Sequence, residues 1–361
     1  MKKIITFGEI MGRLATPGFS RIRQSRSFSV TYAGGEANVA ASICMLGTKA
    51  GFVTAIPNNL LGQACRDFLR SVGIDTSGIL MTDYGRLGLY FVETGANQRP
   101  GTVLYDRNDS SIALTPPAQF EWDPIFEDSS WLHVTGITPA ISKLAADSTF
   151  EAVRRAKAAG LEVSCDINYR KKLWRWDPSM EPRDLAEVVM RKILPFVDLV
   201  LANEEDCSDV LGIRAEATNV EAGSLGIDRY PDVARKLVSE FPNVQKVAIT
   251  LRESVSASHN NWGAMLYIGM EDEALFAPLN NGAYQPYQIR DIVDRVGGGD
   301  SFAGGLIFCL NSSEYSEPQI ALNFATAASC LKHSIQGDFN FSQKEEVEAL
   351  MKGSGSGRIV R

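Results

Sequence analysis

Short β-prone segments alternate with longer helical segments along most of the 361-residue chain. An apolar segment at 3–7 comes first and ends in Gly8-Glu9, and an Ala-rich helix is predicted at 37–48. The further predicted strands are 50–56, 131–135, 161–167, 197–202 and 246–251. The further predicted helices are 62–72, 144–159, 183–194, 204–211, 230–240, 300–311 and 317–333. This alternation predicts an α/β fold in which helices cover both faces of a mainly parallel sheet.

Two segments of the N-terminal third, 13–33 and 86–108, break this alternation. Both alternate apolar with polar residues, which is typical of antiparallel strands with one solvated face. We expect them to pair into a small β-sheet lid over a cleft. The predicted organisation is a core of 1–12, 34–85 and 109–345, a lid of 13–33 and 86–108, and a C-terminal segment 346–361 with a flexible tail. Residues 212–229 are predicted to form a surface excursion.

The charge balance disfavours some partners. With 36 Lys and Arg against 43 Asp and Glu, the net charge is −7, so neither nucleic acid nor an anionic membrane is an expected partner. The N-terminal apolar run is too short for a signal peptide, and no run approaches the roughly 18 apolar residues of a membrane span. We therefore expect a cytoplasmic protein. The three histidines are scattered and the six cysteines form no CxxC pair, so a histidine-built metal site is not expected.

The strongest local signal is a run of three glycines, Gly297-Gly298-Gly299, followed by Asp300 at the start of a predicted helix. Bare backbone amides at a helix N-terminus bind anions, because the donors and the helix dipole point the same way. Asp300 has two interpretations: it is an N-cap of the helix, or it is a catalytic carboxylate beside the anion. A second glycine turn, Gly34-Gly35 with Asn38, leads into the first long helix and is weak by itself.

Together the two turns resemble those of the ribokinase-like (PfkB) carbohydrate kinases, which carry an early GG…N turn and a late GAGD turn. Here Gly298 replaces the usual alanine, and Arg295 stands where many members have threonine. The resemblance extends from Gly8 to about Asp338. It implies a ribokinase-like three-layer α/β/α sandwich with a small β-sheet lid.

Within that family, several stretches look like those of 2-keto-3-deoxygluconate kinases. They are 88–93, 105–107, 136–139, 166–174 and Gly337-Asp338. The resemblance implies the substrate-binding residues Gly34, Asn38, Tyr90, Tyr105, Arg107, Arg170, Asp300 and Asp338. Guanidinium and tyrosine hydroxyl groups suit the carboxylate of a sugar acid. The alternatives are that Arg107 is a solvated lid charge, that Arg170 caps a helix C-terminus, and that the tyrosines only pack.

The nucleotide side is less distinct. Asn203 and Asp206 resemble the family's NxxE motif, whose acidic residue helps to hold magnesium, although a solvated first helical turn also fits. Arg252 replaces the glycine of a TLG-type turn, and it either reaches a phosphate or is a surface side chain. The implied ATP-binding residues are Asn168, Asn203, Thr250, Arg252, Gly297, Gly299 and Asn323. The implied cofactors are ATP and Mg²⁺, and no metal ligand is assigned.

The resemblance implies an ATP-dependent kinase that converts 2-keto-3-deoxygluconate to its 6-phosphate. Asp300 would accept the proton of the attacking hydroxyl, and the amides of Gly297, Gly298 and Gly299 would form an anion hole. One alternative is a kinase of a neutral sugar such as fructose or ribose, and another is a sugar- or nucleotide-sensing protein without catalysis. Exposed edges of lid strands favour pairing with a second subunit, so a homo-oligomer through the lid is expected.

Overall fold

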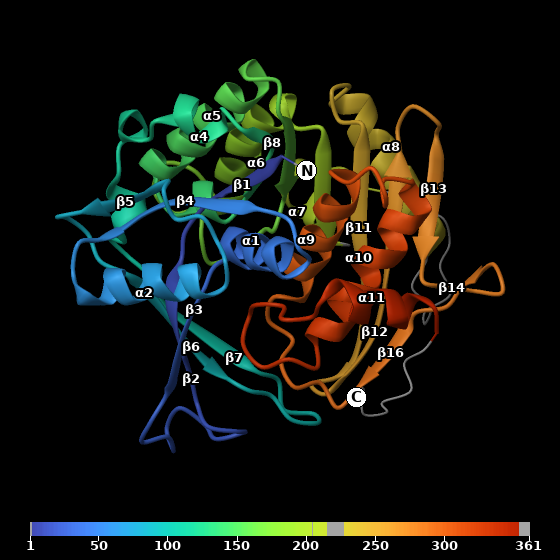
Figure 1. Ribbon diagram of the computed structural model, residues 1–361, viewed down its shortest axis with the longest axis horizontal. Helices are drawn as coiled ribbons and strands as arrows, with labels where there is room; N and C mark the ends of the chain where they lie inside the picture. The colour runs from blue at the N-terminus through green and yellow to red at the C-terminus, as the bar shows by residue number, and fades with distance from the viewer. Residues whose placement is uncertain (1, 204, 215–226, 354–361) are drawn as a thin grey trace.

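A ten-stranded sheet dominates the computed structural model, which describes residues 2–203, 205–214 and 227–353 (Figure 1). The strand order is β13-β12-β11-β10-β9-β8-β1-β4-β5, and β16 pairs with β12. Its strands are β1 (Lys3–Phe7), β4 (Ala50–Pro57), β5 (Ile79–Thr82), β8 (Ser129–Thr135), β9 (Glu162–Asp166), β10 (Leu199–Asn203), β11 (Lys246–Ser256), β12 (His259–Ile268), β13 (Glu273–Ala277) and β16 (Tyr287–Arg290). All neighbours from β5 to β11 are parallel, which confirms the mainly parallel sheet.

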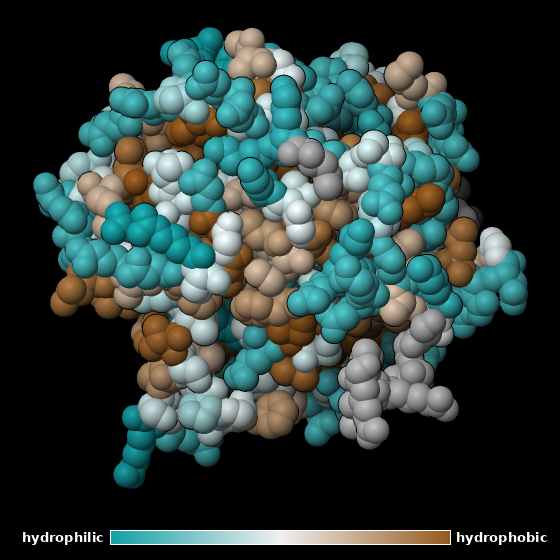
Figure 2. Space-filling model, in the orientation of Figure 1, coloured by the Kyte–Doolittle hydropathy of each residue, from teal (hydrophilic) through white to brown (hydrophobic). Residues whose placement is uncertain are grey.

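Helices cover both faces of this sheet, and each face has its own apolar core. One face carries α1 (Gly35–Met45), α2 (Leu60–Ser71), α9 (Gly298–Leu310), α10 (Pro318–Lys332) and α11 (Lys344–Met351). The other carries α4 (Trp122–Phe126), α5 (Lys143–Ala158), α6 (Pro182–Ile193), α7 (Asp206–Leu211) and α8 (Tyr230–Glu240). The face of the molecule shown in Figure 2 is mostly hydrophilic with scattered apolar residues, as expected for helices whose apolar sides pack inward.

Helices α1 and α9 pack closely because both are rich in small residues. A Cβ at Gly304 of α9 would lie 2.6 Å from the Cβ of Ser42 in α1. Both helices begin at the two glycine turns that the sequence singled out, at Gly34 and Gly297. Their close packing therefore brings two turns far apart in the sequence to the same place in the fold.

The C-terminal half contains strands that the sequence pattern did not predict. Residues 257–290 contribute β12, β13 and β16, which pair antiparallel to β11 or to one another. From Trp262 to Ile268 every residue of β12 is buried, so the strand lacks the apolar–polar alternation that marks a half-solvated strand. Two short strands, β14 (Leu279–Asn280) and β15 (Ala283–Tyr284), form a separate hairpin.

A separate four-stranded sheet, with the order β3-β2-β6-β7, lies beside the main sheet (Figure 1). Its strands are β2 (Met11–Ala15), β3 (Ser29–Ala33), β6 (Gly88–Glu93) and β7 (Thr102–Asp106). The two predicted segments thus pair into one small sheet, but the prediction of purely antiparallel strands is wrong at its centre. There β2 and β6 run parallel, because they come from two segments joined through the core rather than by a hairpin. The exact boundaries of core and lid stay a prediction.

Some predicted segments lie partly outside the described residues. Helix α7 is described from Asp206, whereas Glu204, with which the predicted helix began, is outside. Residues 215–226 of the predicted surface excursion and residues 354–361 of the predicted flexible tail are also outside. Within the described part of the chain, no helix has the length and apolar character to cross a membrane.

Candidate active site

A cavity of about 270 Å³ lies at the carboxyl ends of the parallel strands, between the small sheet and the start of α9. Asp166 and Asn203 end β9 and β10 there, as is usual for ligand sites in open α/β sheets. The cavity brings together almost all predicted site residues. Its lining includes Gly34, Asn38, Tyr90, Tyr105, Arg107, Asn168, Arg170, Asn203, Thr250, Arg252, Gly297, Gly298, Gly299, Asp300 and Asp338.

The late glycine turn opens α9 earlier than predicted. The helix begins at Gly298, and Gly297, with a φ of 85°, is its N-cap. Asp300 therefore lies inside the first turn, and the interpretation of Asp300 as the N-cap is wrong. A Cβ at Gly299 would meet no atom within 4 Å, so this glycine faces open space in the cavity. The bare start of a helix facing a cavity is the geometry of an anion site.

Asp300 is held by the other glycine turn. The side-chain amide of Asn38 in α1 donates to Asp300 Oδ2 at 2.6 Å. Burial, above all, and the neighbouring charge of Asp338 raise the pKa of Asp300 to about 6, although the bond from Asn38 and the charges of Arg170 and Lys332 act in the opposite direction. A carboxyl group with this pKa is ionised at neutral pH and is a stronger base than an ordinary aspartate.

The lid contributes a buried arginine and two tyrosines. Arg107 is 8% exposed and its guanidinium forms an ion pair with Glu9, so its interpretation as a solvated lid charge is wrong. It also lies 5.4 Å from the ring centre of Tyr105. Tyr90 is buried, and its hydroxyl donates to Asp338 Oδ2 at 2.7 Å. The pairing with Glu9 means that a ligand's carboxylate would join an existing ion pair rather than meet a free guanidinium.

Arg170 is exposed and lies in the loop that follows β9. It donates to the carbonyl of Tyr169 at 3.3 Å and caps no helix, so that alternative is wrong. Burial raises the pKa of Asp166, Asp206 and Asp300, and the positive charge of Arg170 opposes this rise at each of them. Arg170 is therefore the cation that faces the acidic side of the cavity.

Asp206 is buried, so the alternative that the NxxE-like motif is only a solvated first helical turn is wrong. Its carboxylate accepts from the backbone N–H groups of Tyr169 and Asn203, both at 3.1 Å. The side chain of Asn203 in turn accepts from the N–H groups of Glu205 and Asp206. Burial, with the charges of Asp206 and Asp300, raises the pKa of Asp166 well above its ordinary value. The half-buried carboxyl group of Asp166 at the end of β9 thus adjoins the buried one of Asp206 at the start of α7.

The nucleotide side carries two arginines. Arg252 of β11 and Arg295 both line the cavity. Arg295 donates to the carbonyls of Ser256 at 3.0 Å and Ala257 at 2.6 Å, and burial together with the charge of Arg252 lowers its pKa. Asn323 is different, because it lies on α10, accepts from Gln319, and is not part of the cavity lining. Its placement near an adenine stays a prediction.

Several charged residues in or next to this site had no role in the sequence analysis. Buried Glu9 and Glu36 and half-buried Asp166 line the cavity, whereas buried Arg13 and Asp294 are not part of its lining. Glu36 accepts from the hydroxyls of Thr135 and Thr138, and burial raises its pKa to about 7. Glu9 and Asp166 could have been found by their position at the end of a predicted strand. Nothing local marks Arg13, whose partners come from the other end of the chain.

The fold and the site together define a class of protein. A base in the first turn of a helix adjoins bare backbone amides, in a cavity at the carboxyl ends of parallel strands and beneath a small sheet. This is an α/β enzyme arranged to hold an anion beside a hydroxyl group that loses its proton.

The chain belongs to the pfkB family of carbohydrate kinases, whose sequence model matches residues 1–251. It is 32% identical to a 2-dehydro-3-deoxygalactonokinase of Haloferax volcanii over 98% of both chains. The crystal structure of a 2-dehydro-3-deoxygluconokinase from Thermotoga maritima is similar, with a TM-score of 0.87 and 41% identity over 98% of this chain and 100% of that one. A pfkB carbohydrate kinase of Listeria grayi has a TM-score of 0.85 and 30% identity over 97% of this chain and 100% of that chain. These similarities confirm the expected family and the ribokinase-like fold.

Proposed function

We propose that this protein is an ATP-dependent sugar acid kinase that phosphorylates 2-dehydro-3-deoxygluconate, also called 2-keto-3-deoxygluconate, to its 6-phosphate. The observation that carries the proposal is the position of Asp300, a base with a pKa of about 6 beside the bare amides that open α9. The names of the relatives from Haloferax volcanii and Thermotoga maritima support a sugar acid as acceptor.

The transfer needs positioning and charge stabilisation more than covalent chemistry. Negative charge is spread over the oxygens of the transferred phosphoryl group in the transition state. The backbone N–H groups of Gly297, Gly298, Gly299 and Asp300 at the start of α9 would stabilise that charge as an anion hole, with the N–H of Gly298 leaving its long 3.4 Å bond to the carbonyl of Arg295. Asp300, held by Asn38, would take the proton of the attacking hydroxyl.

The carboxylate of the acceptor would be bound by two arginines, while Asp300 meets the hydroxyl at the other end of the acceptor. Arg107 from the lid and Arg170 from the loop after β9 supply positive charge, and Tyr105 lies beside Arg107. Charge-assisted hydrogen bonds of this kind are stronger than those between neutral groups. Gly34 and Asp338 complete the proposed acceptor site. Closure of the lid would exclude water, which competes as an acceptor of the phosphoryl group.

ATP would lie on the side of the cavity that carries Arg252 and Arg295. Two guanidinium groups close to a helix N-terminus suit the phosphates of a nucleotide. Thr250, Asn168 and Asn203 line the same cavity and belong to this proposed nucleotide site. Asn323 lies outside the cavity lining, and we keep it only as a residue of an adenine site beyond the cavity.

The residues present fit a magnesium ion. Half-buried Asp166 ends β9 and buried Asp206 begins α7, and neither carboxylate forms an ion pair among the described residues. Magnesium prefers carboxylate oxygens, water and phosphate oxygens as ligands. The ion would neutralise phosphate charge, and these two residues would hold it directly or through water.

A second acceptor has a specific observation in its favour. The Haloferax volcanii relative, similar over its whole length, is named for 2-dehydro-3-deoxygalactonate, which differs from the gluconate in the configuration of one carbon. Both acids carry the carboxylate that the arginines would bind, so the proposed site accepts either by charge alone. The choice between them depends on hydroxyl contacts such as those of Asp338.

The experiment is an ATP-consumption assay with Mg²⁺ over four acceptors: the two dehydrodeoxy acids, fructose and ribose. We expect the better acid to exceed fructose by about 10- to 100-fold in kcat/KM, since a charge-assisted bond contributes roughly 1.5–3 kcal/mol. Equal or better turnover of a neutral sugar would favour the neutral-sugar kinase instead. Binding of a sugar acid without any turnover would favour the sensing protein.

Two wider proposals accompany this function. The enzyme would act in the cytoplasm, where ATP is available. It would assemble as a homo-oligomer through the outer face of the small sheet. This sheet corresponds to the lid predicted at 13–33 and 86–108, and the remaining residues up to 345 would form the core.

A further inference from the structure

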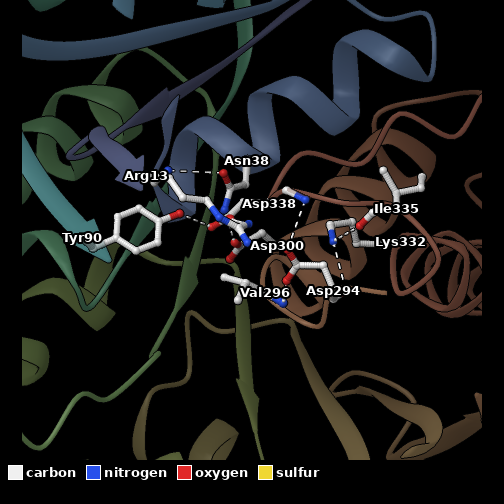
Figure 3. Close-up of polar contacts among 11 residues, drawn as sticks. Arg13, Asn38, Tyr90, Asp294, Val296, Asp300, Lys332, Ile335 and Asp338 are labelled. Atoms are coloured by element: carbon white, nitrogen blue, oxygen red, sulfur yellow. Dashed lines mark hydrogen bonds and ion pairs between the residues drawn. The ribbon is translucent and has the colours of Figure 1, made fainter. Parts of the chain in front are cut away.

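Arg13 lies in the middle of β2 and is buried against the core at 2% exposure. It shares a cross-strand row with Thr31, Tyr90 and Tyr105, the face of the small sheet that meets the cavity. Its guanidinium forms ion pairs with Asp294 and Asp338 (Figure 3). Arg13 itself is not part of the cavity lining, and neither is Asp294.

The two aspartates flank the glycine turn that opens α9. Asp294 Oδ1 accepts from the N–H of Val296, and Asp294 Oδ2 accepts from the N–H of Gly337, both at 3.1 Å. Asp338 packs against the same turn, since a Cβ at Gly297 would lie 2.1 Å from the Asp338 carbonyl oxygen. Asp294 therefore ties the segment before the turn to the segment that carries Asp338.

Both carboxylate oxygens of Asp338 are bound by the small sheet. Oδ1 pairs with Arg13 and Oδ2 accepts from the hydroxyl of Tyr90. Lys332, the other buried cation here, donates instead to the backbone carbonyls of Asp294 and Ile335 (Figure 3). Among the described residues, Arg13 is thus the cation whose side chain contacts these two carboxylates.

We propose that Arg13 is a positioning residue of the phosphoryl transfer. It fixes Asp338 toward the acceptor, and it joins the lid strand β2 to the turn that forms the anion hole. The planar fork of a guanidinium can reach two carboxylates at once, which a lysine ammonium cannot do with fixed geometry. The position of the small sheet and the alignment of the anion hole are then coupled through Arg13. An acceptor that binds against the small sheet therefore also orders the glycine turn.

The variants that test this are Arg13→Lys, Arg13→Met and Asp294→Asn. Removing one partner of a buried ion pair can unfold a domain. If Arg13→Met does not fold, the test therefore rests on Arg13→Lys and Asp294→Asn. In Arg13→Lys and in Asp294→Asn, we expect kcat/KM for the sugar acid to fall about 10- to 100-fold, while the KM for ATP changes less than about threefold. Arg13→Lys should retain more activity than Arg13→Met.

Arg86→Met is the matched control. Arg86 also belongs to the small-sheet region and pairs with a carboxylate, Asp106, but both residues are exposed and the pair does not reach the core. An exposed pair contributes little, so this variant should stay within about threefold of the parent in every constant. If Arg13→Lys and Asp294→Asn fold and also stay within about threefold, or if the KM for ATP rises as much as that for the acid, the positioning role is wrong.

The proposal rests on the proposed function, and hydrogen exchange without ligand separates their failures. In the parent, the amides of 88–92 should be protected together with those of Val296 and Gly337, which donate to Asp294. Arg13→Lys should raise exchange at all of these amides, whereas Arg86→Met should leave Val296 and Gly337 unchanged. Inactivity of the parent on every acceptor, with this exchange pattern intact, would refute the proposed function alone. Unchanged exchange at Val296 and Gly337 in Arg13→Lys would refute the coupling, whatever the activity.

Discussion

At the scale of single residues, the pKa of Asp300 determines the pH dependence of catalysis. The group acts as a base only when ionised, and burial raises its pKa to about 6. We therefore expect kcat to fall about tenfold per pH unit as the pH drops below about 6, and to level off above about 7. Rate measurements with saturating ATP and acceptor test this. A kcat that stays constant down to about pH 4.5 would mean that Asp300 titrates as an ordinary aspartate.

Asp300→Asn should lower the activity of the protein and raise its stability at pH 7. The folded pKa of about 6 exceeds the reference value of 3.8, so the folded state binds the proton more tightly and stability falls as the pH rises between these values. At pH 7 the ionised group costs about 3 kcal/mol, which asparagine removes. We expect kcat to fall about 10²- to 10⁴-fold and Tm to rise at pH 7 but not at about pH 4. A folded, nearly fully active variant would contradict the catalytic role.

Arg107 and Arg170 should contribute to binding of the acceptor and not to binding of ATP. Arg107→Ala and Arg170→Ala should each lower kcat/KM for the sugar acid about 10- to 100-fold, since each removes a charged donor. Arg107→Ala also leaves Glu9 buried and unpaired, so its Tm should fall, whereas exposed Arg170 should be replaceable without loss of stability. Unchanged constants for the acid in both variants would refute the sugar acid as acceptor.

At the scale of elements, two glycines of the same turn should respond differently to alanine. Gly297 has a φ of 85°, and a Cβ there would overlap the Asp338 carbonyl oxygen, so Gly297→Ala should destabilise the fold. A Cβ at Gly299 meets no atom and enters the anion site instead. Gly299→Ala should thus keep its Tm and lose most of its kcat. Thermal unfolding and kinetics of both variants test this, and a fully active Gly299→Ala would argue against an anion at this turn.

The same turn explains why glycine stands at 298, where the family usually has alanine. A Cβ there would lie 3.0 Å from the ring of His333, which also contacts Trp262. The ring of His333 therefore takes up space that a methyl group at this position would need.

At the scale of the whole molecule, the outer face of the small sheet is the expected subunit interface. Leu14 pairs with Val30 and Phe91, and Phe91 pairs with Leu104, so these four apolar residues form one row on that face. Val30 is 60% and Leu104 56% exposed, so this row leaves apolar side chains open to solvent. Covering this row by a second copy would bury it and protect the sheet edges.

Val30→Asp and Leu104→Asp should therefore each convert an oligomer to monomers, because a buried unpaired charge opposes association. Light scattering after size exclusion measures the mass. Val188→Asp is the control, since Val188 is exposed on α6, away from the small sheet. A parent that is monomeric at every concentration tested would refute the interface.

The sequence by itself determined those features of the fold that depend on residues close together in the chain. The strand–helix alternation predicted the parallel sheet, and the glycine turns before α1 and α9 predicted two junctions that do meet at the cavity. Glycine, a helix start and an apolar strand are recognisable locally, because backbone freedom, capping and burial act over a few residues.

Only the tertiary structure decided which charges meet. Arg13 and Asp338 are far apart in the chain, and their pairing depends on β2 lying parallel to β6 above the turn of α9. The same holds for Arg107, whose buried ion pair with Glu9 contradicts only the alternative of a solvated lid charge. Buried charges need partners, but the partner can come from any element that folding brings near, so local pattern cannot name it.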